Sequence, residues 1–122
     1  MERAIFGTWK ITQVADGQDS TSISDEEAAA TVGLPLQIGP DTIRFGKANC
    51  AAPVFRTTRR RTYTYFVRQF NFDPQSLHLP DSVLEIEVKC LQPVGINFIY
   101  VRDKNRLVFY WEGFFLNAQR SR

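Results

Sequence analysis

The amino-acid sequence predicts an all-β fold, a small antiparallel β-barrel with one short α-helix after its first strand. Residues that favour strands are abundant, with 10 Phe, 4 Tyr and 2 Trp among 122 residues. Short segments of alternating apolar and polar residues recur along the chain, separated by turn-forming residues. The run Gly7-Thr8-Trp9 opens the first of these segments and suggests a barrel that is entered at its closed end.

The first strand is expected over residues 8–14, and a helix follows it. Ser24 and Glu27 form a capping box, in which each side chain accepts a hydrogen bond from the backbone amide of the other. The acidic first turn suits the helix dipole, and Gly33 provides a C-terminal stop. A helix over 25–32, about eight residues, is too short to be stable alone. We therefore expect it to plug or cover one end of the sheet.

The cleanest alternation lies in the segment 83–90, where Glu85, Glu87 and Lys89 share one face. We expect that face to be solvated, because the opposite face is apolar. Residues 75–80 are expected to form a surface connection. The remaining strands are predicted, between turn-forming residues such as Gly39-Pro40-Asp41, at 36–38, 42–45, 62–72, 96–101, 107–111 and 114–117.

The composition predicts one domain that spans residues 1–122. A hydrophobic content of 43% is enough for a proper core and argues against disorder. The chain has no internal repeat, no low-complexity segment and no linker that would divide it. No stretch approaches the ~18 apolar residues that a membrane-spanning helix needs, so we expect no membrane span.

Cys50 and Cys90 are the only cysteines, and the chain has one histidine. Without a Cys-x-x-Cys pair these residues cannot build a zinc site, so we expect neither a metal nor another cofactor. Two interpretations remain, a disulfide or two inert buried thiols. A disulfide closing a loop of this length would contribute ~3–4 kcal/mol in the chain-entropy model.

A disulfide also bears on the compartment, because disulfides persist in oxidising environments. The chain starts without a recognisable signal peptide. The protein is therefore either cytosolic or a mature protein whose export signal has been removed and replaced by Met1. The cysteines favour the second interpretation, and we expect a periplasmic or secreted location.

The order of elements resembles the lipocalin or calycin superfamily, and more narrowly the small exported lipocalin-like proteins of bacteria. The features that carry the resemblance are Gly-x-Trp in the first strand, a strand meander and an arginine after the last strand. The resemblance implies that Trp9 lies at the closed end of the barrel, and that Arg120, or else Arg122, packs over it. A cation over an indole ring is favourable by ~0.5–2 kcal/mol. The second lipocalin motif, a Thr-Asp-Tyr type loop, is absent.

The densest charge cluster is Arg59-Arg60-Arg61, with Arg56 and Arg68 on either side and with Tyr63 and Tyr65 close behind. Arginines beside aromatic rings bind anions, acidic protein surfaces or single-stranded nucleic acid. The alternative is a solvated strand end whose charges protect an edge. An extended chain would place Arg59, Arg61, Tyr63 and Tyr65 on one face and Arg60 on the other. This split argues against one continuous groove.

Three further groups are candidates for chemistry. A set of aromatic residues could line a ligand cavity, although small barrels also fill their interior with side chains. Glu112 is a possible inward carboxylate, or else an outward residue at a strand bend. His78 lies in a loop-like segment, and no motif marks it as a catalytic base. The cavity candidates are Phe66, Phe70, Phe72, Phe98, Tyr100, Phe109 and Trp111.

These observations predict a non-catalytic exported binding module. The preferred version binds a partner protein through loops or a strand edge, as inhibitors of lysozymes or proteases and periplasmic immunity proteins do. The arginine cluster favours a partner with an acidic face. One alternative is a carrier of a small apolar ligand, and another is an enzyme that uses Glu112 or His78. Nucleic acid is the least favoured partner, because a net charge of +2 does not by itself imply it.

Overall fold

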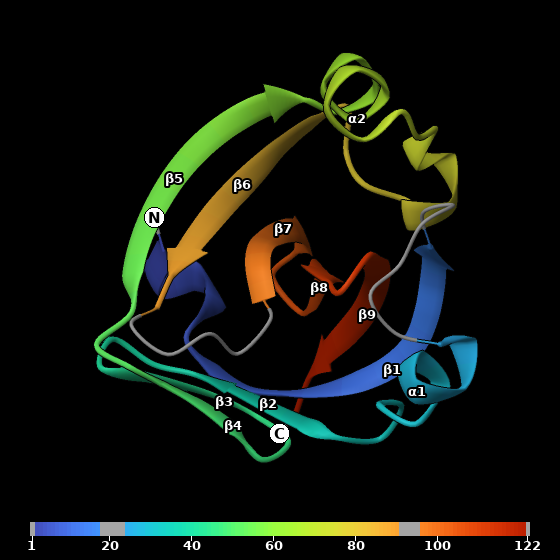
Figure 1. Ribbon diagram of the computed structural model, residues 1–122. Coiled ribbons are helices and arrows are strands. Elements are labelled where there is room, and N and C mark those ends of the chain that lie inside the picture. The colour runs from blue at the N-terminus through green and yellow to red at the C-terminus, as the bar shows by residue number, and fades with distance from the viewer. Residues whose placement is uncertain (1, 18–23, 91–95, 122) are drawn as a thin grey trace.

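The computed structural model describes residues 2–17, 24–90 and 96–121, which form one curled antiparallel sheet (Figure 1). The strand order in the sheet is β4-β3-β2-β1-β9-β8-β7-β6-β5. The predicted all-β class is confirmed. The strands are β1 Gly7–Gly17, β2 Pro35–Ile38, β3 Thr42–Phe45, β4 Ala48–Ala51, β5 Val54–Arg61, β6 Ser82–Lys89, β7 Ile96–Asp103, β8 Arg106–Trp111 and β9 Phe114–Arg120.

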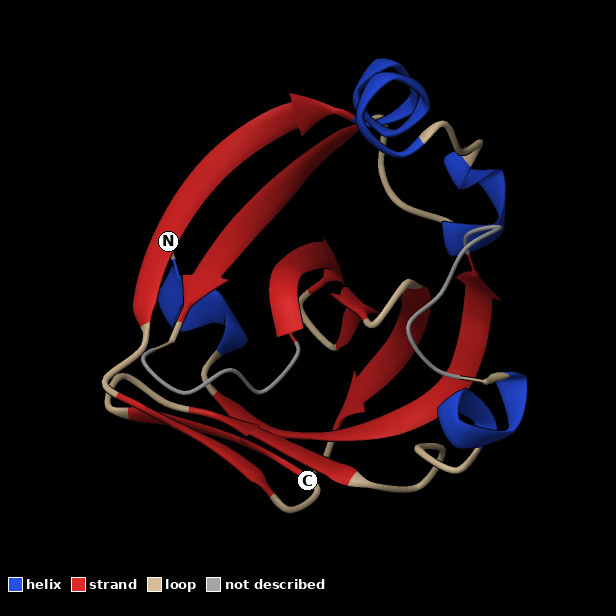
Figure 2. Cartoon of the chain, in the orientation of Figure 1, coloured by secondary structure: helices blue, strands red, loops and turns tan. Residues whose placement is uncertain are grey.

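Four short helices accompany the described sheet (Figure 2): η1 Glu2–Ile5, α1 Asp25–Ala29, α2 Thr62–Phe70 and η2 Pro74–Leu77. The helix predicted at 25–32 is present but shorter. Its capping box between Ser24 and Glu27 forms as expected, and residues 30–33 continue as a turn. The predicted surface connection at 75–80 contains η2, which buries Leu77.

The concave face of the sheet is filled by apolar side chains. Ile86, Ile99, Phe109 and Leu116 are cross-strand neighbours on four adjacent strands. They share one buried cluster with side chains from β2, β3 and β4, at the other end of the sheet. Because strands from both ends of the sheet meet in this cluster, it marks the inside of the curl.

A second cluster covers the opposite, convex face. Tyr100 and Val108, each one residue away along its strand from the concave set, face outward and are cross-strand partners. Phe66 of α2 and Leu77 of η2 pack over them, together with Phe115 of β9. Helices α2 and η2 therefore lie against the convex face of the sheet, which they shield from water.

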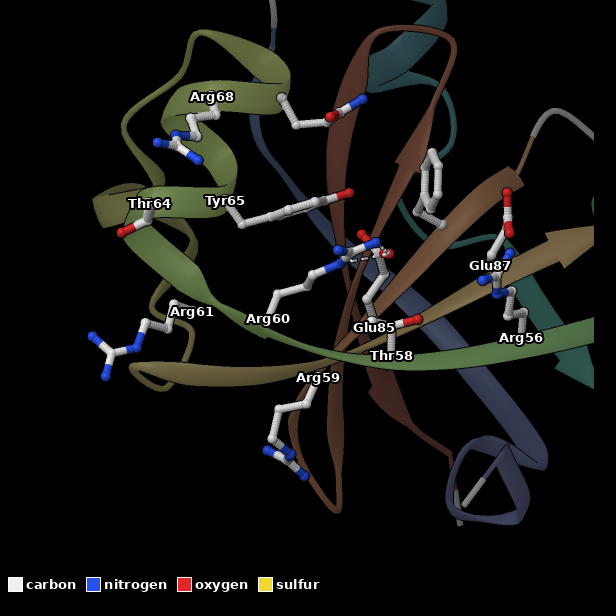
Figure 3. A pocket seen from close by; sticks show the side chains of 12 residues that line it. Arg56, Thr58, Arg59, Arg60, Arg61, Thr64, Tyr65, Arg68, Glu85 and Glu87 are labelled. Atoms are coloured by element: carbon white, nitrogen blue, oxygen red, sulfur yellow. Dashed lines mark hydrogen bonds and ion pairs between the residues drawn. The ribbon is translucent and has the colours of Figure 1, made fainter.

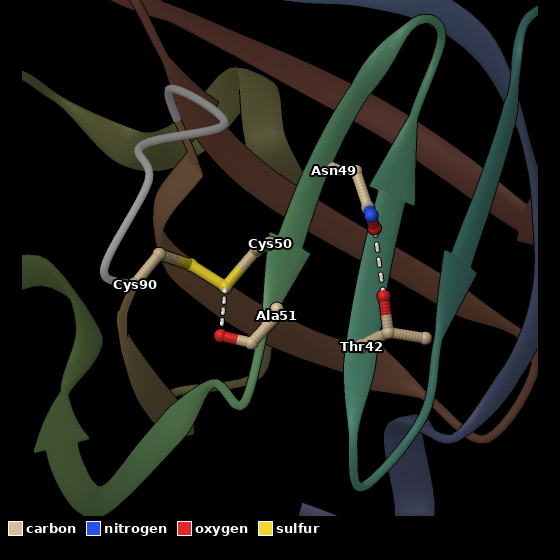
Figure 4. Close-up of a disulfide and its surroundings, with 5 residues drawn as sticks. All are labelled: Thr42, Asn49, Cys50, Ala51 and Cys90. Atoms are coloured by element: carbon tan, nitrogen blue, oxygen red, sulfur yellow. Dashed lines mark hydrogen bonds between the residues drawn. A yellow bond between two sulfur atoms is a disulfide. The ribbon is translucent and has the colours of Figure 1, made fainter.

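A disulfide joins the two ends of the sheet. Cys50, in β4, is bonded to Cys90, directly after β6, with their Cα atoms 5.6 Å apart (Figure 4). β4 pairs only with β3, and β5 pairs only with β6. Because no ladder connects β4 to β5, these edges are held together by the short chain connection at residues 52–53 and by the disulfide. The predicted disulfide is confirmed.

Arg120 packs over the ring of Trp9. The Arg120 guanidinium carbon is 4.2 Å from the centre of the fully buried Trp9 ring. Its nitrogens also donate hydrogen bonds to the backbone carbonyls of Ala4 and Phe6. Gly7 has a positive φ of 138°, and a Cβ there would meet Arg120 Nη1 at 2.7 Å. A side chain at position 7 would therefore be strained by the backbone angle and would displace the Arg120 guanidinium. Arg122 lies outside the described residues.

The strand predicted at 62–72 is wrong, because this segment forms α2. Its aromatic and β-branched residues favour a strand locally, but such preferences are weaker than tertiary packing. Phe66 and Phe70 are spaced four residues apart and meet as one helical stripe on the second cluster. Asn71 ends the helix in the left-handed conformation, with φ of 50°.

Candidate functional site

An open cleft of about 680 Å³ lies between β5, β6 and α2 (Figure 3). Most of its polar lining comes from arginine and threonine side chains, and its apolar wall is formed by Tyr65 and Phe98. The lining residues are Arg56, Thr58, Arg59, Arg60, Arg61, Thr64, Tyr65, Arg68, Gln69, Glu85, Glu87 and Phe98.

The change from β5 to α2 builds this cleft. Arg61 is both the last residue of β5 and the N-cap residue of α2. Thr62 fixes the bend, because its backbone N–H donates to the carbonyl of Asp81 and its hydroxyl donates to the carbonyl of Pro80. The helix then returns over the convex face, and this brings Tyr65 and Arg68 beside the arginines of the strand.

A buried carboxylate forms the floor of the cleft. Glu85 is only 2% exposed, and one of its oxygens accepts hydrogen bonds from Nε and Nη2 of Arg60, at 3.3 and 3.2 Å. The other oxygen accepts from the Tyr100 hydroxyl at 2.9 Å. Burial of a carboxylate is costly unless it is paired in this way. The expectation that Glu85 lies on a solvated face is therefore wrong.

Arg60 also stacks on Tyr65, with its guanidinium carbon 4.6 Å from the ring centre. The Tyr65 and Tyr100 hydroxyls lie 3.5 Å apart. Burial, together with the nearby Glu85 carboxylate, raises the pKa of Tyr65 to about 12. Burial, then the hydrogen bond with Tyr65 and then the Glu85 charge, raise the pKa of Tyr100. Both tyrosines therefore stay neutral throughout the physiological range, and the Tyr100 hydroxyl remains a hydrogen-bond donor to Glu85.

The other arginines of the cleft lie nearer to solvent. Arg56 lies opposite Glu87 on the adjacent strand, while Arg59, Arg61 and Arg68 are exposed. Within the described part of the chain, only Arg60 of these five forms an ion pair. Their positive charge is thus mostly uncompensated.

The predicted grouping of these residues by strand face is only partly right. Arg59 and Arg60 do lie on opposite sides of β5 (Figure 3). However, Tyr65 joins Arg60 rather than Arg59, because the chain has become helical before residue 65. Tyr63 is 64% exposed and lines a separate hollow beside His78. The floor of the cleft therefore lies on the Arg60 side of β5, and Arg59 borders it with a side chain that points away from Arg60 and Glu85 (Figure 3).

The aromatic cavity candidates do not surround one space. Phe66, Phe70, Phe72, Phe98 and Tyr100 belong to the second cluster or pack against it. Phe109 is in the first cluster, and Trp111 packs against that cluster. The set is thus divided between the two faces of the sheet.

Glu112 and His78 have local structural roles. Glu112 and Gly113, with φ of 53° and 93°, form the two-residue turn between β8 and β9. Positive φ at both positions is the geometry of a type I′ hairpin turn. Burial, and then the Glu112 charge, raises the pKa of Tyr110. His78 is exposed and ends η2 in the left-handed conformation. Neither residue lines the arginine cleft.

Sequence reasoning missed Glu85 as a member of the site. The signal that could have found it is the helical spacing of Phe66 and Phe70. A helix over 62–70 needs an apolar surface to cover, and the convex face of β6 and β7 is the surface it covers. A helix predicted over 62–70 would have implied that Glu85 is buried, and a buried carboxylate needs a cationic partner.

Among the described residues, no cluster of three or more His, Cys, Asp or Glu side chains could hold a metal ion. The helices in the same part of the chain are all too short or too polar to cross a bilayer. Comparison of the chain with protein-family models, with curated proteins and with solved structures found no match.

Proposed function

We propose that this chain is a non-catalytic binding module that docks an acidic surface of a partner protein at the arginine cleft. The observation that carries the proposal is the uncompensated charge of Arg59, Arg61 and Arg68 around a structured floor. Exposed arginines form strong, geometrically specific hydrogen bonds with carboxylates. Charge of one sign around a cleft also steers an oppositely charged partner and rejects wrong ones.

The floor of the cleft supports this proposal. The Arg60–Glu85 pair and the stacked Tyr65 ring hold α2 at a fixed position relative to β5. A rigid surface loses little conformational entropy on binding, and this favours affinity. A half-buried tyrosine beside arginine, as Tyr65 beside Arg60, is also typical of the residues that dominate protein interfaces.

The disulfide supports an exported setting, periplasmic or secreted, in which the module would act as an inhibitor or immunity-type protein. The curled sheet and the Trp9–Arg120 stack support a lipocalin-like origin for the fold. The alternative of an apolar-ligand carrier is less well supported, because Trp9, Phe109 and their neighbours occupy the concave face. The alternative of an enzyme based on Glu112 or His78 has no support from the positions of these two residues.

The test compares two charge-reversed variants with equal net charge. Arg59→Glu, Arg61→Glu and Arg68→Glu are combined in the site variant. The matched control combines Lys10→Glu, Arg44→Glu and Lys47→Glu, three exposed residues of the opposite part of the sheet.

Each protein, immobilised without reductant, is used to retain partners from an extract of the natural host. We expect a protein that binds wild type and the control but not the site variant, with an affinity in calorimetry that falls as ionic strength rises. Equal retention by the site variant would contradict the proposal. Native mass spectrometry gives a second check, since a mass lost on denaturation would favour the carrier.

A further inference from the structure

The edge of the sheet at β5 supports a more specific inference, which rests on the proposed function. We propose that the partner binds as an additional β-strand along β5, through an extended segment rich in acidic residues. The proposal defines both the surface and the chemistry of its occupant.

The backbone of β5 has free hydrogen-bonding groups on its outer side. The Thr62 N–H donates to the carbonyl of Asp81, and this pair continues the antiparallel register of β5 and β6. In such a ladder, alternate residues bond to the partner strand. The even-numbered residues of β5 therefore face β6. The backbone N–H and C=O groups that point to the free edge belong to Phe55, Thr57, Arg59 and Arg61.

This edge pairs with no other described strand. β5 is the last strand of the sheet, and it runs away from β4 towards α2 (Figure 1). The outward groups of Phe55, Thr57 and Arg59 have no hydrogen bond to a described residue, whereas the Arg61 carbonyl, at the N-cap of α2, accepts the first bond of that helix. Of the residues whose backbone groups point outward, Arg59 and Arg61 are exposed, while Phe55 and Thr57 are half-buried. The edge thus offers eight residues of strand, enough for a specific added strand.

The side chains along this edge select an acidic occupant. Arg59 and Arg61 project to one face of β5, while Arg56 and Arg60 project to the other. Directly opposite residues of neighbouring strands lie about 4.5–5.5 Å apart at their Cβ atoms, where opposite charges attract. An added strand with Asp or Glu at successive positions would therefore meet an arginine on either face.

The same charges disfavour a second copy of this chain. Two β5 edges that paired with each other would place arginines opposite arginines, and like charges directly opposite are destabilising. The edge is therefore protected against self-association while remaining available to an acidic strand. This selectivity distinguishes a docking edge for a partner from an edge of a homodimer.

Two single proline variants test whether the partner binds the backbone of β5. Thr57→Pro removes one outward donor from β5 without removing a bond to β6. Ala51→Pro is the matched control. The Ala52 N–H donates to the carbonyl of Asp41, which places residue 51 on the outward side of β4, at the other free edge. Thermal unfolding of both variants confirms that each is folded.

The probe is a displayed library of random peptides of about ten residues, selected on the immobilised wild-type protein. We expect the selected peptides to be rich in Asp and Glu, to lack proline, and to bind Thr57→Pro about tenfold more weakly. Ala51→Pro is expected to bind them like wild type. Peptides that are not acidic, an empty selection, or equal binding to Thr57→Pro would each overturn the proposal.

The partner retained from the host extract separates this inference from the proposed function. If the charge-reversed site variant loses that partner while Thr57→Pro keeps it, strand addition is overturned and the arginine site stands. If neither variant loses it, both proposals fail.

Discussion

The guanidinium of Arg60 and the carboxylate of Glu85 form an ion pair that joins the edge strand to its neighbour diagonally. Their register partners are Val83 and Thr58, so the two side chains reach along the strands to meet. Glu85 is almost completely buried, whereas the Arg60 side chain is 39% exposed. The pair thus presents one charged group, held in position, to the cleft.

Removing the carboxylate should destabilise the protein. In Glu85→Ala, the Tyr100 hydroxyl loses its acceptor and Arg60 loses its partner. Because Arg60 can be hydrated, we expect a loss of about 2 kcal/mol in the free energy of unfolding, below the usual cost of breaking a fully buried pair. Urea denaturation measures it. Glu87→Ala, on the same strand and half-buried, is the control, and an equal loss there would contradict this account.

Stability should fall in strongly alkaline solution. The pKa of Tyr65 is about 12 in the folded protein against an ordinary value of 10.0, and that of Tyr100 is raised as well. Between these pH values the unfolded chain holds fewer protons than the native state, so the free energy of unfolding decreases as pH rises from about 10. Denaturation midpoints at several pH values measure the slope. It should be shallower in Tyr65→Phe, and an unchanged slope would contradict the assignment.

Arg61→Ser should stabilise the fold and weaken partner binding. Arg61 occupies the N-cap position of α2 in an extended conformation, with φ of −76°, and makes no side-chain capping bond. Serine at such a position accepts a bond from the first helical turn and is worth about 1 kcal/mol. Calorimetric unfolding and binding to the selected acidic peptides measure the two effects. A gain in stability without a loss of affinity would mean that Arg61 has no part in binding.

Loss of the disulfide should destabilise the protein and loosen β4 in particular. The bridge spans 40 positions of sequence, for which the chain-entropy model gives about 4 kcal/mol. No ladder joins β4 to β5, so amide hydrogen exchange in the double variant Cys50→Ala, Cys90→Ala should accelerate first in β3 and β4. Exchange that accelerates equally in β8 and β9 would contradict a local role.

Arg120→Lys should cost more than a surface substitution. Arg120 stacks on Trp9 while donating hydrogen bonds to the carbonyls of Phe6 and Ala4. A lysine ammonium cannot stack as a plane and bond at both sites together. We expect a loss of about 1–2 kcal/mol and a change in tryptophan fluorescence. Arg44→Lys, at an exposed arginine of β3, should leave both measurements unchanged.

Local patterns were sufficient for several elements. The alternation in 83–90, the capping box at Ser24 and the turn around Pro40 predicted β6, α1 and the β2–β3 hairpin, because each depends on residues adjacent in sequence. β4 and β5 were not predicted, since Ala48–Ala51 and Val54–Arg61 lack an apolar alternation strong enough to mark them. Their pairing partners stabilise them instead.

The sequence by itself determined the all-β class, the availability of two cysteines for one bridge, and the arginine that could meet Trp9. Tertiary structure alone decided that residues 62–70 are helical, because the exposed convex face of β6 to β9 required an apolar cover. That same packing buried Glu85 beside Arg60. The cleft thus exists only after the chain has folded back on itself, since its charges come from segments whose contact no local pattern encodes.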